Sequence, residues 1–73
     1  MAAYGEQPVK KALEYGAVRK LILSKKLGKD KIRELSEMAA NISAEVEIVS
    51  VETPEGEQFF NLAGIGAILR FRF

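Results

Sequence analysis

The first apolar residues of the chain recur at the spacing of a helix. Val9, Ala12 and Leu13 fall on one side of it, and Pro8 is tolerated in its first turn because a proline there loses no hydrogen bond. Gly16 is expected to end this helix, since glycine adopts the left-handed conformation without a steric penalty.

Residues 17–24 predict a strand in the interior of a sheet. Their centre, residues 21–23, is apolar without alternation, which is typical of strands that are covered on both faces. A basic loop over residues 24–29 follows. Asp30 then fits the start of the next helix, as an N-cap or as an acid in the first turn.

Residues 31–42 have the clearest helical pattern in the chain. Their apolar positions line one side of the helix: Ile32, Leu35, Met38, Ala39 and Ile42. The next stretch, residues 44–51, predicts a strand. Val46 and Ile48 first alternate with Glu45 and Glu47, so the first half of the strand should have one face in contact with water. Val49 and Val51 then fall on the opposite parity, which implies a second half that is covered on both faces.

The last third of the chain predicts a third helix and a third strand. After a loop over residues 53–56, the helix would run through Gln58, Phe59, Phe60, Leu62 and Ala63. The helix is expected to end at Gly64, and Gly66 is expected to give the chain the backbone freedom for the turn that follows. The final strand, residues 67–73, alternates between two sets of side chains, namely Leu69, Phe71 and Phe73 against Arg70 and Arg72.

The predicted order is therefore helix, strand, helix, strand, helix, strand. Strands that are separated by helices imply right-handed crossovers, and hence an α/β fold with a small sheet that is mostly parallel or mixed. Three strands make a thin sheet for this architecture. Residues 1–5 are too small and irregular to predict a regular element, so we expect an additional N-terminal element outside this chain.

Length and composition narrow the possible functions. At 73 residues the chain is one domain, and without cysteine or histidine it has no disulfide and no conventional zinc or haem site. A net charge of +1 indicates neither a nucleic-acid binder nor an acidic tail. No apolar run reaches the ~18 residues that span a bilayer, and the N-terminus does not have the pattern of a signal peptide. We expect a soluble, cytoplasmic protein with no cofactor and no membrane partner.

No stretch has the pattern of a catalytic site. The glycines of Gly64-Ile65-Gly66 stand between a helix and a strand, which reverses the order found in phosphate-binding loops. Glu45 and Glu47 share a strand face, where a solvated edge is a simpler explanation than acid–base chemistry. The hydroxyl side chains have no histidine to activate them. We therefore expect neither an enzyme nor a small-molecule substrate.

Two charged groups are candidates for contacting a partner. Residues 19–33 form a basic window whose lysines either touch RNA or the ribosome or are a solvated rim. Three of them are candidate RNA contacts: Lys25, Lys26 and Lys29. Arg70 and Arg72 stand between phenylalanines and form either a partner-binding ridge or the snorkelling side chains of a covered strand.

Three blocks of the sequence together resemble one family. Residues 4–24 are similar to its opening, "YG..EV..ALE.GAV..LLIS", and residues 45–50, EVEIVS, match its second strand. Residues 56–59, GEQF, followed by residues 64–71, GIGAILRF, resemble its "GEQ" and "GIAAILRF" ending. On these residues the chain resembles the C-terminal domain shared by Pelota and the archaeal and eukaryotic class-one peptide release factors.

The resemblance implies a fold and a setting. The fold is an α/β/α sandwich related to ribosomal and kink-turn RNA-binding proteins. The setting is the end of a three-domain translation factor that enters the ribosomal A site as a tRNA mimic. In that family the domain is a docking module that contacts a translational GTPase and the ATPase that recycles ribosomes. The codon-reading and Gly-Gly-Gln motifs belong to other domains, and neither occurs in this chain.

Spacing favours Pelota within the family. Release factors usually carry a long insertion between the first strand and the second helix, where this chain has only residues 25–29. Residues 55–59, EGEQF, are closer to the release-factor "EG.QF", so a release factor is the alternative. The "GILRY" segment linked with GTPase binding maps onto residues 66–71, with Ala67 inserted and Phe in place of Tyr. The partner-binding residues implied in this way are Ile68, Leu69, Arg70, Phe71 and Arg72.

Overall fold

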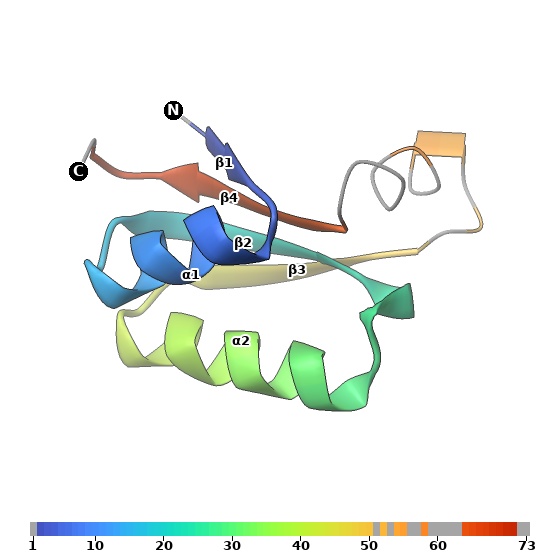
Figure 1. Cartoon of the computed structure of the whole chain (residues 1–73), viewed down its shortest axis with the longest axis horizontal. Helices are drawn as coiled ribbons and strands as arrows, with labels where there is room; N and C mark the ends of the chain where they lie inside the picture. Colours follow the sequence, from blue (N-terminus) through green and yellow to red (C-terminus); the bar gives the residue numbers. More distant parts are fainter. Residues whose placement is uncertain (1, 51, 53, 56–57, 59–63, 72–73) are drawn as a thin grey trace.

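The computed structural model describes residues 2–50, 52, 54–55, 58 and 64–71. Its elements follow the order β1 (Ala2–Tyr4), α1 (Glu6–Glu14), β2 (Val18–Ser24), the 3-10 helix η1 (Lys25–Leu27), α2 (Lys29–Asn41), β3 (Glu45–Val49) and β4 (Ile65–Leu69). The four strands form one mixed sheet in the order β1-β4-β2-β3 (Figure 1). The α/β class, both helices and the interior position of β2 confirm the sequence predictions.

The direction of β4 makes the sheet mixed, which is one of the two arrangements that the sequence predicted. β2 and β3 are parallel, but β4 runs antiparallel to both β2 and β1. The backbone N–H of Ser24, the last residue of β2, donates to the carbonyl of Gly64, just before β4, over 2.8 Å. β4 therefore begins at the end of the sheet where β2 finishes, and it has to run back.

The N-terminal residues form a strand that the sequence pattern did not predict. Ala2, Ala3 and Tyr4 pair with Ile68, Ala67 and Gly66 of β4, which makes β1 one edge of the sheet. The sheet thus has a fourth strand within residues 2–4, where we predicted no regular element. Three residues, two of them alanine, give no alternating apolar pattern, so only the pairing with β4 defines this strand.

The core lies between the two helices and one face of the sheet. Its residues are each at most 3% exposed: Val9, Ala12, Leu13, Ala17, Val18, Leu21, Leu23, Leu35, Ala39, Ile65 and Ala67. Leu21 and Leu23 of β2 pair with Ala67 and Ile65 of β4, so these side chains share a face. α1 and α2 both contribute to this core and therefore cover the same face of the sheet (Figure 1).

Both helices end in the same backbone motif. After α1, the N–H groups of Gly16 and Ala17 donate to Leu13 and Ala12, and Gly16 has φ +66°. After α2, Ser43 and Ala44 donate to Ala40 and Ala39, and Ser43 has φ +58°. These are Schellman motifs, in which a left-handed residue lets the last carbonyls find donors. The predicted role of Gly16 is confirmed, and Asp30 lies in the first turn of α2.

The C-terminal strand ends earlier than predicted. β4 covers Ile65–Leu69 instead of residues 67–73, so Gly66 lies inside the strand and not at a corner. Its last residue, Leu69, pairs with Val18, the first residue of β2, and one further backbone hydrogen bond joins the N–H of Arg70 to the carbonyl of Ala17 over 2.7 Å. Phe71, expected to continue the alternation, lies outside the strand and is 44% exposed.

The strand β3 is also less covered than predicted. It is an edge strand, and Ile48 is 44% exposed. Val49, in the half that was predicted to be covered on both faces, is only half-buried, and Val51 lies outside the described residues. The predicted third helix, which would form the third layer of the sandwich, lies largely outside the described residues; Gln58 is helical. Among the described residues, no helix combines the length and the apolar character that crossing a membrane requires.

Candidate functional site

The two predicted contact sites lie at opposite ends of β2. Arg70 and Phe71 follow β4 at the end where β2 begins, because Leu69 pairs with Val18. Lys25 and Lys26, in η1, directly follow the last residue of β2. The basic window of residues 19–33 is therefore divided between two ends of the sheet and is not one surface.

The guanidinium of Arg70 is bonded to the protein's own backbone. Its Nε and one terminal nitrogen donate to the carbonyl of Val18 over 3.1 and 2.9 Å, and the same terminal nitrogen donates to the carbonyl of Ile42 over 3.3 Å. The Arg70 backbone N–H donates to Ala17 over 2.7 Å. Ile42 is the C-cap of α2, where a cation is also favoured by the helix dipole. Arg70 thus fixes the end of β4 to β2 and α2.

The five predicted partner-binding residues do not form one ridge. Leu69 packs against the core on the helix-covered face, whereas Ile68 pairs with Lys20 on the opposite face. Phe71 presents an exposed aromatic ring just beyond Arg70. Arg72 lies outside the described residues. Of this set, Phe71 is an exposed apolar group that the Arg70 hydrogen bonds hold close to the sheet.

A pocket of about 430 Å³ opens beside Arg70. Its lining combines three cationic side chains with one acidic, one hydroxyl and one apolar side chain: Arg19, Lys20, Arg70, Glu45, Ser43 and Ile68. Lys20 is already paired, since its Nζ lies 2.8 Å from Oε1 of Glu47. The hydrogen bond to Glu47 raises the pKa of the Lys20 ammonium above its ordinary value. Two of the three cations beside this pocket therefore already have partners, Lys20 in Glu47 and Arg70 in backbone carbonyls.

The three lysines predicted to contact RNA are exposed at the other end of β2. Lys25 and Lys26 belong to η1, and Lys29 is the first residue of α2. The turn between them is set by Ser24, whose buried Oγ accepts a hydrogen bond from the backbone N–H of Lys26 over 3.3 Å. The structure therefore places these lysines together on one tip of the molecule.

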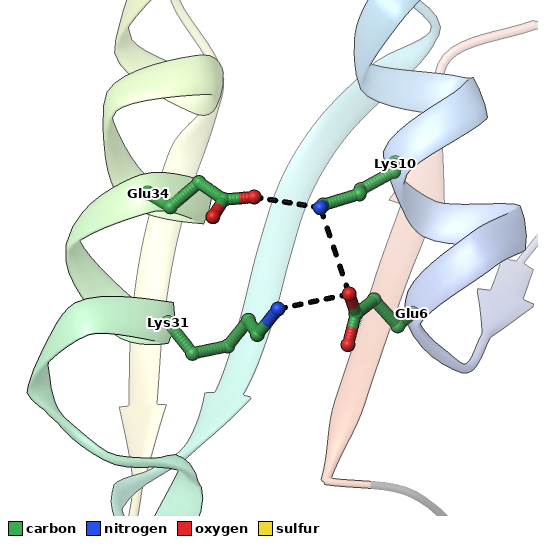
Figure 2. Close-up of polar contacts among 4 residues, drawn as sticks. All are labelled: Glu6, Lys10, Lys31 and Glu34. Carbon is green, nitrogen blue, oxygen red and sulfur yellow. Dashed lines mark hydrogen bonds and ion pairs between the residues drawn. The ribbon is translucent and has the colours of Figure 1, made fainter.

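A cluster of four charged residues joins the two helices, which the sequence pattern did not reveal. Figure 2 shows Glu6 and Lys10 of α1 facing Lys31 and Glu34 of α2. Lys10 Nζ lies 2.7 Å from Glu34 Oε1 and 3.5 Å from Glu6 Oε2, and Lys31 Nζ lies 2.8 Å from Glu6 Oε2. The i,i+4 spacing of Glu6 and Lys10 was a visible signal, but the contacts across helices were not.

These contacts shift the protonation of the cluster. The hydrogen bond from Lys31 holds the pKa of the Glu6 carboxyl below its ordinary value, and the hydrogen bond from Lys10 does the same for the pKa of Glu34. The hydrogen bond to Glu34 raises the pKa of Lys10. Lys31 is part of the basic window, so one of the positive charges of that window is used to join the two helices.

Comparison with known families decides the assignment. The family model described as eRF1 domain 3 matches residues 1–73, the whole chain. The chain belongs to the eRF1 domain 3 family. This finding confirms the resemblance that the three sequence blocks carried.

Both branches of the eRF1 domain 3 family are among the relatives. The chain is 43% identical to the protein pelota homolog of Pyrococcus furiosus over 76 residues, which cover 99% of this chain and 21% of that protein. It is 32% identical to the peptide chain release factor subunit 1 of Thermococcus kodakarensis over 121 residues, which cover 99% of this chain and 29% of that protein. The longer alignment means that the release factor contains residues which this chain lacks. The chain thus spans about a fifth of the length of the Pelota relative.

Solved structures of the same family share the fold. The Pelota protein of Thermoplasma acidophilum matches with a TM-score of 0.90 at 28% identity, over 100% of this chain and 24% of that one. Dom34 of S. cerevisiae, described as a translation termination-like factor interacting with Hbs1, matches with a TM-score of 0.88 at 29% identity, over 99% and 22%. A model of ribosome-bound archaeal Pelota and ABCE1 matches with a TM-score of 0.85 at 39% identity, over 97% and 21%.

Proposed function

We propose that this chain is the protein-docking domain of a Pelota-like ribosome rescue factor. It binds a translational GTPase and a ribosome-recycling ATPase and has no catalytic role of its own. The proposal is supported chiefly by the 43% identity to a Pelota homologue over 99% of the chain. Such a factor works on ribosomes, so we propose a cytoplasmic location and contact with the ribosome through the longer protein.

The structural neighbours support the proposed partners. Dom34 is described as interacting with Hbs1, and archaeal Pelota as ribosome-bound together with ABCE1. We take these two to represent the GTPase and the recycling ATPase that the family resemblance implies. The chain resembles the C-terminal part of those proteins, which is the part that the resemblance makes a docking module.

The contact surface that we propose is the C-terminal end of β4. Here Arg70 fixes the backbone through its hydrogen bonds to Val18 and Ile42, and Phe71 is 44% exposed directly after it. An exposed aromatic ring on a fixed backbone loses little conformational entropy on binding, which is a property of residues that dominate interfaces. Ile68, Leu69 and Arg72 belong to the segment that the family resemblance implies, but Ile68 and Leu69 lie on opposite faces of the sheet, so Phe71 is the residue that we test.

Calorimetry with the cognate GTPase tests this surface. Phe71→Ala should weaken binding by at least about tenfold, because truncating a central aromatic typically costs ~2 kcal/mol or more. Tyr4→Ala is the matched control, since Tyr4 is an exposed aromatic, at 60%, which pairs with Gly66 away from this end of β4. Equal loss in both variants, or no binding by the unaltered domain when the full factor binds, contradicts the proposal.

A release factor is the alternative within the same class. The relative from Thermococcus kodakarensis supports it at 32% identity, and the segment EGEQF at residues 55–59 resembles release factors. The gene upstream of this domain distinguishes the two. A Gly-Gly-Gln motif there would favour the release factor and contradict the Pelota assignment.

RNA contact through the lysine tip is a second candidate function. The exposed Lys25, Lys26 and Lys29 lie together, and Lys29 begins a helix whose N-terminal N–H groups favour phosphate. Replacing all three by Ala should weaken binding to ribosomal RNA and lower the slope of log K against log salt by about 2 to 3. Lys11→Ala, an exposed lysine on α1, is the control. A filter assay without retained RNA would end this candidate.

A further inference from the structure

The strand β3 has an open edge. Within the described part of the chain, β3 pairs with β2 alone, so every second residue of the strand directs its N–H and C=O away from the sheet. The residues of this edge are exposed from Glu45 to Ile48, and Val49 is half-buried. Two of them are apolar, since Val46 is 39% and Ile48 is 44% exposed.

The two edges of the sheet differ in how they are protected. β1 is only three residues long, and short edge strands offer few unpaired groups. β3 has five residues, contains neither proline nor lysine, and keeps a continuous register with β2 without a bulge. Proline, lysine and bulges are usual devices that prevent an edge strand from pairing, and β3 has none of the three. β3 is therefore the edge that can still accept another strand.

The two faces of β3 have different chemistry. Val46 and Ile48 pair with Leu21 and Leu23, so they lie on the helix-covered face at its margin. The glutamates point to the other face. Lys20 engages Glu47 over 2.8 Å, whereas Glu45 is in no ion pair among the described residues. Exposed Glu52 beyond the strand adds further negative charge.

A second copy of this chain is a poor fit for the edge. In the fully overlapped antiparallel pairing of two β3 strands, Glu47 lies opposite Glu47, and like charges directly opposite one another are destabilising. A partner strand with a basic residue opposite Glu47 would instead be attracted to it.

We propose that β3 accepts an extended segment of another protein as an added strand, in which basic side chains face Glu45 and Glu47 and apolar side chains cover Val46 and Ile48. Main-chain hydrogen bonds to the open edge supply affinity, and the alternation of charge and apolar surface supplies specificity. This surface is distinct from Phe71 and does not depend on the proposed docking function.

Nuclear magnetic resonance of the labelled 73-residue chain tests this inference with designed peptides. The probe KVKVKVK should shift the amides of residues 45–49 and slow the exchange of every second one. Peptides EVEVEVE and the scrambled KKVVKKV should bind at least about tenfold more weakly, because they lose the charge match or the alternation. Shifts confined to other strands, or equal binding by the scrambled peptide, overturn the inference.

A charge-reversed variant gives a second, opposite readout. Glu45→Lys with Glu47→Lys should transfer the preference from KVKVKVK to EVEVEVE, with circular dichroism showing that the fold is kept. If the variant unfolds, the location of the peptide-induced shifts in the unaltered chain still shows whether the peptide binds at β3. A concentration-dependent dimer that shifts the same amides without peptide would contradict the inference, because the edge would then pair with a second copy.

Discussion

Charged residues at the two ends of β2 are used in different ways. At its start, Arg70 donates three hydrogen bonds to the carbonyls of Val18 and Ile42, so its charge is part of the fold. At its end, Lys25 and Lys29 are exposed on a tip of the molecule. Both groups are basic in sequence, yet substitutions should alter stability at the first end and binding at the second.

The largest effect is expected for Arg70→Ala. It removes three hydrogen bonds from a charged donor and leaves the C-cap carbonyl of α2 without this partner, so we expect a loss of about 1–2 kcal/mol in the free energy of unfolding. Urea denaturation measures it. Arg70→Lys should recover less than half, because an ammonium cannot reproduce the planar fork. An unchanged denaturation midpoint for Arg70→Ala would mean that these bonds do not hold the end of β4.

Next in size is Gly16→Ala, at the end of α1. A Cβ at Gly16 has room, with Ile42 Cγ2 at 3.9 Å, so the cost comes from φ +66° alone. We expect a loss of about 1 kcal/mol by thermal denaturation. Gly16→Asn should lose less, since asparagine tolerates this conformation. An equal loss in both variants would point to packing instead of backbone strain.

Ser43→Gly should have the opposite sign. Ser43 occupies in α2 the position that Gly16 has in α1, with φ +58°, so glycine relieves strain there. The expected gain is about 0.5 kcal/mol, because glycine also has more freedom to lose from the unfolded chain. Denaturation in parallel with Gly16→Ala shows whether the two helix ends are equivalent. Destabilisation by Ser43→Gly would show that they are not.

A smaller effect is expected from acid, through the cluster between the helices. The pKa values of Glu6 and Glu34 are lowered in the folded chain, so their contribution is present above the ordinary value of 4.5 and is lost as pH falls below it. The melting temperature of the unaltered chain should therefore fall between neutral pH and pH values under about 4.5. This fall should be smaller in the variant Glu34→Gln. Glu37→Gln, on the exposed side of α2, is the control and should leave that fall unchanged.

The smallest effect on stability is expected for the triple lysine variant at the other end of β2. Exposed side chains typically contribute within about 0.5 kcal/mol, and these substitutions leave the backbone hydrogen bond from Lys26 to Ser24 in place, so replacing Lys25, Lys26 and Lys29 by Ala should change urea denaturation least. A loss comparable to that of Arg70→Ala would remove the contrast between the two ends.

Sequence reasoning recovered the parts of the fold that depend on local spacing. The apolar stripe of α2, the interior run of β2 and the left-handed Gly16 each follow from residues within a few positions of one another. It also recovered the family, because blocks such as GIGAILRF are short and contiguous. These features are encoded within single elements, so no knowledge of their neighbours was needed.

Only the tertiary structure decided which distant residues meet. The direction of β4, the pairing that makes Ala2–Tyr4 a strand, and the separation of the basic window all depend on strand pairing. Arg70 and Val18 are 52 positions apart, and Glu6 and Lys31 are 25 apart. No periodic pattern records such contacts, because their energy appears only after the sheet and helices have brought the two groups together.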